Sequence, residues 1–130
     1  MTAATAIGYS IREAALELGV SVHTLRYYER EGLLSVPRLD SAQRRYGPQE
    51  LERLRFLLAL RGTGMSMALI RRYMRLVGQG DGTVAERRAL LLEHQQAVTE
   101  QIRTLQHDLG AIRRKLEIYD RLTGRTEGVN

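Results

Sequence analysis

The chain has 130 residues, enough for one compact domain with an extension but cramped for an enzyme with its own substrate domain. It contains no cysteine, which excludes disulfides, thiolate metal sites, iron–sulfur clusters and thiol redox chemistry. Its formal charge is +5. Residues 1–80 carry 12 basic and 7 acidic side chains, whereas residues 81–130 carry 8 of each. The positive charge therefore lies in the N-terminal part, as a surface that binds a polyanion requires.

The motifs of catalytic and cofactor sites are not found in this sequence. It has no Ser/His/Asp set, paired-carboxylate motif, phosphate-binding loop or dinucleotide fingerprint, so we predict neither an enzyme nor a cofactor. His94 and His107 have no close ligand partner, so no metal is expected. Residues 1–6 lack the features of a secretion signal, and no apolar run approaches the roughly 18 residues of a membrane span. We expect a cytoplasmic protein.

The first periodic segment predicts a short helix. Ser10 and Glu13 have the spacing of a capping box, and an apolar stripe follows them, so a helix is expected from Ile11 to Leu18. Gly19 supplies the unusual backbone conformation of a tight turn.

A second short helix follows the turn, capped by Ser21 and ended by Gly32. The residues that recur at core-facing spacing are Val22, Leu25 and Tyr28. The other face is basic and aromatic, with His23, Arg26, Tyr27 and Arg30. Two short helices joined by a glycine turn, with the second outwardly basic, indicate a helix-turn-helix.

Residues 33–47 contain a proline, small polar residues and a basic end without helical periodicity. This composition predicts a short β-hairpin, or wing, with its tip at residues 40–42. Its base carries Arg44, Arg45 and Tyr46, which we expect to straddle a phosphate backbone.

Two more helices and a glycine-rich segment come next. Gly47-Pro48 with Glu50 predicts a helix start, and that helix ends at Gly62-Thr63-Gly64. Ser66 caps a helix through Val77, whose polar side carries Arg71, Arg72 and Arg75. These arginines either add phosphate contacts or pair with acidic residues across a dimer. Residues 78–82 hold three glycines and predict a linker or hinge.

From Val84 to Leu122 the sequence predicts one helix with a heptad seam, in which Gln95 is the polar exception. Such a helix is about 60 Å long, whereas the preceding 77 residues fold to a body about 30 Å across. Half of the seam therefore needs another surface, and the same helix of a second copy is the economical partner. The predicted interface residues are Leu91, Val98, Ile102, Leu105, Leu109, Ile112, Leu116 and Tyr119.

With these elements in place, residues 9–34 (YSIREAALELGVSVHTLRYYEREGLL) resemble the signature of the MerR family of transcription regulators. The Arg44-Arg45-Tyr46 run and TGMSMALIRRYM at residues 63–74 also fall where that family has them. The resemblance implies a homodimer joined by an antiparallel coiled coil. It implies binding to a near-palindromic promoter site and a switch of DNA shape that RNA polymerase uses. It also supports Arg26 and Tyr27 as the recognition-helix pair.

The sequence departs from several branches of that family. The metal-sensing and iron–sulfur-sensing branches rely on cysteines, which are absent, and Ala59 stands where an aldehyde-responsive branch has a cysteine. The multidrug-sensing branch adds a large ligand domain, whereas this chain ends about eight residues after the coiled coil. The sequence therefore leaves the effector open, although a ligand pocket between the coiled coil and the helix at residues 66–77 is one conjecture.

We expect a mainly α fold with an N-terminal winged helix-turn-helix, a small β-hairpin wing and a long dimerisation helix. The predicted segments are a tail at residues 1–8, the DNA-binding domain at 9–77, a linker at 78–83, the coiled-coil helix at 84–122 and a tail at 123–130. The predicted DNA contacts are His23, Thr24, Arg26, Tyr27, Arg30, Arg44, Arg45 and Tyr46. The alternatives are an excisionase-like architectural DNA-binding protein and a coiled-coil adaptor that binds an acidic protein.

Overall fold

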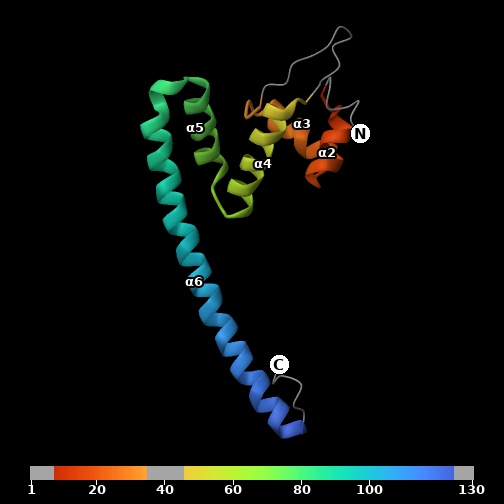
Figure 1. Ribbon diagram of the computed structural model, residues 1–130, viewed down its shortest axis with the longest axis vertical. Coiled ribbons are helices and arrows are strands. Elements are labelled where there is room, and N and C mark those ends of the chain that lie inside the picture. The colour runs from red at the N-terminus through yellow and green to blue at the C-terminus, as the bar shows by residue number, and fades with distance from the viewer. Residues whose placement is uncertain (1–7, 35–45, 125–130) are drawn as a thin grey trace. The chain divides into compact units, whose positions relative to one another are not determined.

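The computed structural model describes residues 8–34 and 46–124, which are almost entirely helical. The order is α2 (Ile11–Leu18), α3 (Val22–Arg30), α4 (Pro48–Gly62), α5 (Met67–Gly78), a short 3-10 helix η1 (Asp81–Thr83) and the long α6 (Val84–Thr123) (Figure 1). The chain divides into two compact units, Met1–Arg88 and Ala89–Asn130, which we call the head and the stem. The mainly helical fold and the long C-terminal helix are thus confirmed.

Local capping chemistry sets the bounds of α2. The Ser10 hydroxyl accepts from the Glu13 amide at 3.2 Å, and the Glu13 carboxylate accepts from the Ser10 amide at 2.8 Å. Gly19 ends the helix in the left-handed conformation with φ of 71°, which a residue without a Cβ adopts at no steric cost. The capping box and both ends of this helix are as predicted.

The next helix, α3, begins in the same way and leads into a buried segment. The Ser21 hydroxyl accepts from the Thr24 amide at 3.0 Å and caps the helix. After α3, Gly32 has φ of 77°, and the Leu33 amide donates to the Tyr28 carbonyl at 3.0 Å. This turn directs Leu33 and Leu34 into the core.

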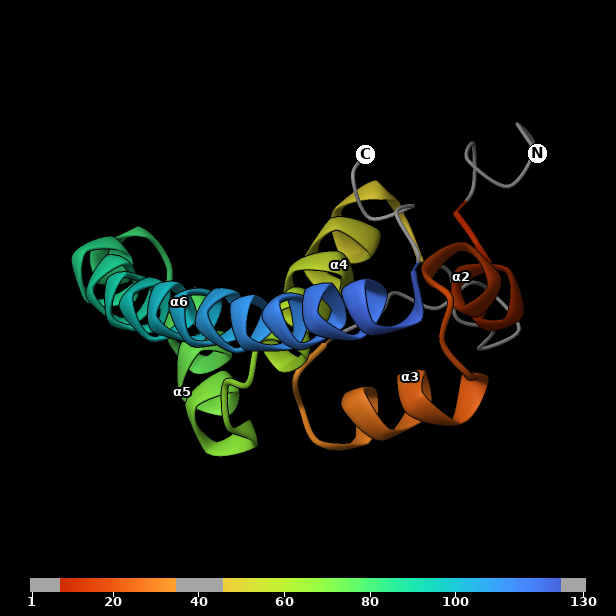
Figure 2. The ribbon, with the colours of Figure 1, turned by 90° about the horizontal axis from the view of Figure 1, so that it is seen from below.

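The core of the head is formed where α2 packs on α3 and α4 packs on α5 (Figure 2). Its largest fully buried side chains are Tyr46, Leu25, Leu54, Leu57 and Ile70. On α4 the structure buries Leu57 and leaves the adjacent Leu58 half-buried. One exposed ion pair, between Arg55 and Glu17 at 3.4 Å, also connects α4 to α2.

A single β-bridge occurs within the two described ranges of the head. Tyr9 and Tyr46 pair in antiparallel fashion, with the Tyr9 amide donating to the Tyr46 carbonyl at 2.8 Å and the reverse bond at 2.7 Å. The predicted hairpin wing falls mostly on residues 35–45, which lie outside the described residues. The bridge brings residue 46 beside the start of α2 and so fixes where the chain enters α4.

The predicted linker at residues 78–83 is a hydrogen-bonded turn. Helix α5 extends through Gly78, and η1 follows at Asp81–Thr83. The Thr83 hydroxyl donates to the Leu76 carbonyl at 2.6 Å, and the Arg87 guanidinium donates to the Gly80 carbonyl at 3.0 Å. The role of this turn as a hinge remains a prediction.

Helix α6 runs without a break through the stem and leaves apolar side chains exposed along the predicted seam. The exposed fractions are 50% for Ile102, 68% for Leu105, 42% for Leu109, 57% for Ile112, 54% for Leu116 and 54% for Tyr119. Leu91 and Val98 are half-buried.

No helix in the described part of the chain has the length and apolar character that crossing a membrane requires.

Candidate nucleic-acid interface

The outward face of α3 carries the side chains that the helical spacing predicted to lie there. His23, Arg26 and Arg30 are exposed, and Tyr27 is half-buried. Leu25 is fully buried on the opposite face. This division follows from the 3.6-residue period, which places residues three or four apart on the same side.

Two aromatic rings and one guanidinium order the centre of this face. The rings of Tyr27 and Tyr28 lie 5.8 Å apart at an angle of 54°, and Tyr28 is only 7% exposed, so it belongs to the core. The guanidinium of Arg30 lies 5.8 Å from the Tyr27 ring centroid, close enough for a cation–π contact. The ring of Tyr27 therefore lies between a core aromatic ring and a charged neighbour.

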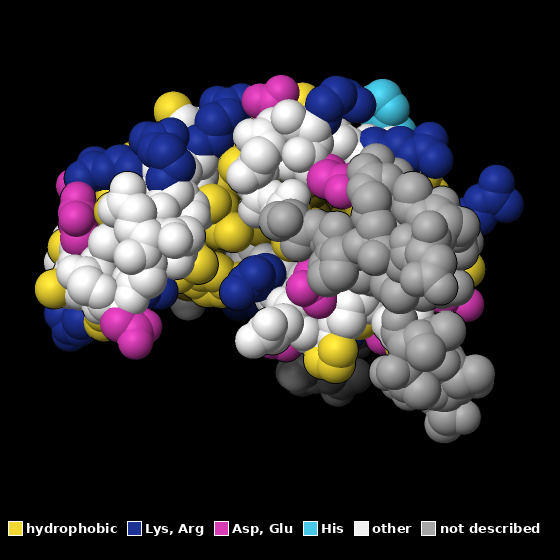
Figure 3. Space-filling view, turned by 90° about the horizontal axis from the view of Figure 1, so that it is seen from above, with side chains coloured by type: hydrophobic (Ala, Val, Ile, Leu, Met, Phe, Trp, Pro, Cys, Tyr) yellow, Lys and Arg dark blue, Asp and Glu magenta, His cyan; other side chains and the backbone are white. Residues whose placement is uncertain are grey.

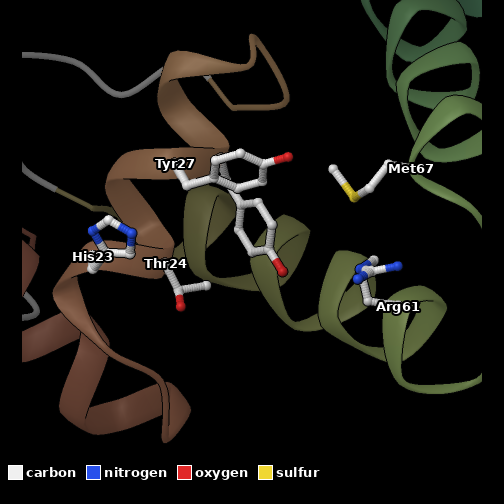
Figure 4. Close-up of a pocket in the computed structure, with 6 residues that line it drawn as sticks. His23, Thr24, Tyr27, Arg61 and Met67 are labelled. Carbon is white, nitrogen blue, oxygen red and sulfur yellow. The ribbon is translucent and has the colours of Figure 1, made fainter.

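A hollow of about 320 Å³ lies beside α3 and draws its walls from three helices. His23, Thr24 and Tyr27 come from α3, Arg61 from the last turn of α4, and Met67 from the first turn of α5 (Figure 4). Tyr28 also lines it. No acidic side chain lines this hollow.

Sequence reasoning did not identify Arg61 as a site residue. Arg61 is exposed and lies 34 positions after Tyr27 in the sequence, yet both line the same hollow. The available signal was a basic residue directly before the glycine turn at residues 62–64. The sequence could not show that the fold of the head brings Arg61 to the same hollow as residues of α3.

Several arginines of the head are paired with carboxylates of the same protomer. Arg71 of α5 donates to Glu31, the residue after α3, at 2.6 Å, and Arg72 donates to Glu86 at 3.4 Å. These two arginines have partners within the head.

Lys and Arg side chains recur along the upper edge of the view in Figure 3, beside a histidine. Arg26 and Arg30 of α3 and Arg61 of α4 are exposed, so the part of the head around α3 presents a basic surface.

Of the three DNA contacts predicted at the base of the wing, the structure describes only Tyr46. Arg44 and Arg45 lie outside the described residues, so their role remains a prediction. Tyr46 has no exposed surface, and its backbone is paired with Tyr9. The expectation that Tyr46 contacts DNA is therefore corrected, because a buried side chain cannot reach a phosphate; Tyr46 is a core residue.

Metal-binding residues do not gather in the described part of the chain, where no group of three His, Cys, Asp or Glu side chains could hold a metal ion.

Two family models match the sequence. One, described as the MerR HTH family regulatory protein, covers residues 9–76, and the other, described as MerR, DNA binding, covers residues 51–114. The chain belongs to the MerR family. Its two matched regions together include α2 to α5 and most of α6.

Curated members of the MerR family align over much of the chain. An uncharacterized HTH-type transcriptional regulator of Haemophilus influenzae is 36% identical over 114 residues, which are 87% of this chain and 84% of the relative. The HTH-type transcriptional regulator AdhR of Bacillus subtilis is 35% identical over 92 residues, which are 70% of this chain and 66% of the relative.

Solved MerR structures share the fold. The crystal structure of HiNmlR, described as a MerR family regulator lacking the sensor domain and bound to promoter DNA, superposes with a TM-score of 0.81 at 35% identity, covering 94% of this chain and 95% of that one. A MerR family regulator from Bacillus thuringiensis gives a TM-score of 0.79 at 26% identity, covering 85% and 98% of the two chains. The protein is a DNA-binding transcription regulator of MerR type.

Proposed function

We propose that this MerR protein binds an inverted-repeat promoter site as a homodimer and controls transcription by changing the shape of the bound DNA. The observation that carries the proposal is the exposed basic and aromatic face of α3, extended by Arg61 of α4. We propose a regulatory rather than an enzymatic role, carried out in the cytoplasm, where the promoter and RNA polymerase are found.

The chemistry of the α3 face suits the major groove of DNA. An arginine can donate two parallel hydrogen bonds to guanine, and tyrosine and histidine can donate to phosphate oxygens. Arg26 is the candidate for a base contact because it is exposed near the middle of α3. Tyr27, Arg30 and Arg61 are candidates for backbone contacts that fix the position of α3 on the duplex.

The exposed seam of α6 supports the homodimer. Its large apolar side chains at heptad spacing are 42% to 68% exposed from Ile102 to Tyr119. A second copy of α6 offers the same spacing and can cover them in a two-fold arrangement. Two heads joined in this way present two copies of α3, as an inverted repeat requires.

The step from binding to regulation rests on the family and on the solved relative. HiNmlR was crystallised on promoter DNA and matches 94% of this chain. We propose that the dimer likewise engages a promoter and that the bound DNA is bent or untwisted, so that RNA polymerase can use it. Bending the DNA of such a promoter site costs several kcal/mol, which phosphate contacts from both heads must offset.

Fluorescence anisotropy with the full chain and DNA of its own promoter region tests the proposal. We expect Arg26→Ala to weaken specific binding by about 1–3 kcal/mol, or about 5- to 150-fold, if Arg26 contacts a base. Arg61→Ala should weaken specific and non-specific binding alike and lower the slope of log K against log salt by about 1, since one phosphate contact is lost.

Arg114→Ala is the matched control, because Arg114 is an exposed arginine of the stem at an outer heptad position. It removes the same charge and should leave DNA affinity unchanged. Unchanged affinity of both Arg26→Ala and Arg61→Ala would show that α3 does not form the interface. A coiled-coil adaptor would not distinguish an inverted repeat from scrambled DNA, and an excisionase-like protein would affect recombination rather than transcription from the promoter.

A further inference from the structure

A second hollow of the head lies between α4, α5 and the first turn of α6, and we call it the aromatic groove. Its volume is about 350 Å³. All of its lining residues belong to the head, between Glu52 and Arg87. It shares no lining residue with the hollow beside α3, so the proposed DNA contacts do not account for it.

The floor of the aromatic groove is formed by two rings and two aliphatic side chains. The rings of Phe56 and Tyr73 lie 5.7 Å apart at 52°, a tilted arrangement favoured between aromatic side chains. Phe56 is 40% exposed, although the ring of Tyr73 already covers one side of it. Met74 and Val77 complete the floor and are half-buried. An apolar, planar molecule can cover this floor.

The rim of the groove is positively charged. Arg87 is fixed there because its Nε donates to the Thr83 hydroxyl at 2.9 Å and its Nη2 donates to the Gly80 carbonyl at 3.0 Å. The remaining N–H groups of this guanidinium are left to donate to another acceptor. A guanidinium already held in place loses little side-chain entropy when it binds an anion.

Arg53 of α4 supplies a second guanidinium and is exposed. The acidic member of the lining, Glu52, lies 3.9 Å from Arg55, which offsets part of its charge. The rim therefore has two guanidinium groups against one partly neutralised carboxylate.

We propose that the aromatic groove binds a small aromatic carboxylate, whose ring lies on the Phe56–Tyr73 floor and whose carboxylate accepts from Arg53 and Arg87. Ligand sites are typically apolar hollows of about 300–1,000 Å³ with a few placed polar groups. The volume of this groove lies at the lower end of that range, which suits a molecule with one or two rings. A carboxylate gains charge-assisted hydrogen bonds that a neutral or cationic analogue cannot form.

The binding of this ligand does not depend on the proposed function, but its regulatory consequence does. Helix α5 carries Tyr73 and Met74 of the groove and also Arg71, which pairs with Glu31 directly after α3. A ligand that contacts α5 therefore acts on the helix that is tied to the end of α3. In this reading the aromatic groove is the effector site of the regulator.

Isothermal titration of the full chain without DNA tests the site with three matched probes: 2-naphthoate, 2-naphthamide and 2-naphthylmethylammonium. They share one ring system and differ in charge. We expect 2-naphthoate to bind at least about tenfold more tightly than 2-naphthamide, because its carboxylate accepts charge-assisted hydrogen bonds that the neutral amide cannot form. The cationic probe should bind most weakly, because the rim repels it.

Variants of the rim locate the binding. Arg53→Gln and Arg87→Gln should each remove most of the preference for 2-naphthoate over 2-naphthamide. Arg53→Gln preserves the turn that Arg87 supports, so it tests the site even if Arg87→Gln weakens folding. Arg75→Gln is the matched control, because Arg75 is an exposed arginine of α5 that does not line the groove.

Three results would overturn the proposal: equal affinities for the three probes, an equal loss in Arg75→Gln, or binding of 2-naphthoate that weakens as protein concentration rises. The last would show that a second copy of the chain occupies the groove. Arg26→Ala tests whether the ligand site is independent of the DNA interface, and this variant should bind 2-naphthoate as the wild type does. If it does so and the wild type nevertheless fails to bind promoter DNA, the proposed function fails while the ligand site stands.

Discussion

Substituting Leu105 with aspartate tests whether two copies of α6 form the dimer. Leu105 is 68% exposed in the protomer and lies near the middle of the helix. Full burial of a leucine stabilises by about 1.5–3 kcal/mol, so covering this exposed part contributes about 1–2 kcal/mol per copy. A two-fold dimer contains the residue twice, and the loss is then about 2–4 kcal/mol, or about 30- to 1,000-fold in the dimer dissociation constant.

The introduced charge adds to that loss. In a fully overlapped antiparallel pair the middles of the two helices meet, so the two new carboxylates lie close together in an apolar seam, where an unpaired charge is costly. Sedimentation velocity over a range of concentrations should therefore show wild-type dimers and Leu105→Asp monomers.

His107→Asp is the matched control for this experiment. His107 is exposed at an outer heptad position two residues away, and the substitution introduces the same aspartate into the same helix. It should leave the dimer intact. Dimers of Leu105→Asp with the wild-type dissociation constant would place the interface elsewhere than on this seam.

Three further substitutions test the stability of single helices, each measured by urea unfolding. Ser21→Ala removes the hydroxyl that accepts from the Thr24 amide and should lower the free energy of unfolding of the head by about 1 kcal/mol; an unchanged value would mean that solvent satisfies this amide equally well. Gly19→Ala should destabilise the head by about 1–2 kcal/mol, since the φ of 71° disfavours a Cβ. Gly110→Ala in the middle of α6, where the nearest atom to an added Cβ is Arg114 Nη1 at 3.5 Å, should stabilise its helix by about 1 kcal/mol. Equal signs for the two glycine substitutions would contradict the conformational argument.

The helix boundaries were predictable because they depend on contacts between residues close in sequence. The Ser10–Glu13 capping box, the Ser21 cap and the Gly47-Pro48 start each act within one helical turn. Their donors and acceptors can therefore be recognised without any knowledge of the tertiary fold. The exposed and buried faces of α3 followed from its period for the same reason.

The features that the sequence did not reveal depend on which elements meet in space. On α5, for example, Leu69 is 39% exposed whereas Leu76 is 7% exposed, although both are leucines of one helix. Helix α5 contacts both α4 and η1, and the Leu76 carbonyl accepts from the Thr83 hydroxyl at 2.6 Å. Tyr46 is buried, and its backbone pairs with that of Tyr9, 37 residues earlier. Periodicity within one segment carries no information about such pairs.

The ion pair between Arg71 and Glu31 shows how a weak contact can still matter for regulation. Its side chains are 37% and 32% exposed, so it contributes at most about 1 kcal/mol to stability. Its 2.6 Å bond nevertheless connects α5 to the residue that ends α3. A ligand in the aromatic groove can shift the equilibrium between two orientations of α3. The size of that shift is limited by the difference in the ligand's binding free energy for the two corresponding positions of α5. By linkage, promoter DNA must change the affinity for that ligand by the same factor that the ligand changes the affinity for DNA. The free energy of the Arg71–Glu31 contact thus sets an upper limit on the coupling free energy that this ion pair can transmit. A larger coupling free energy requires the core contacts between α4 and α5 to change as well.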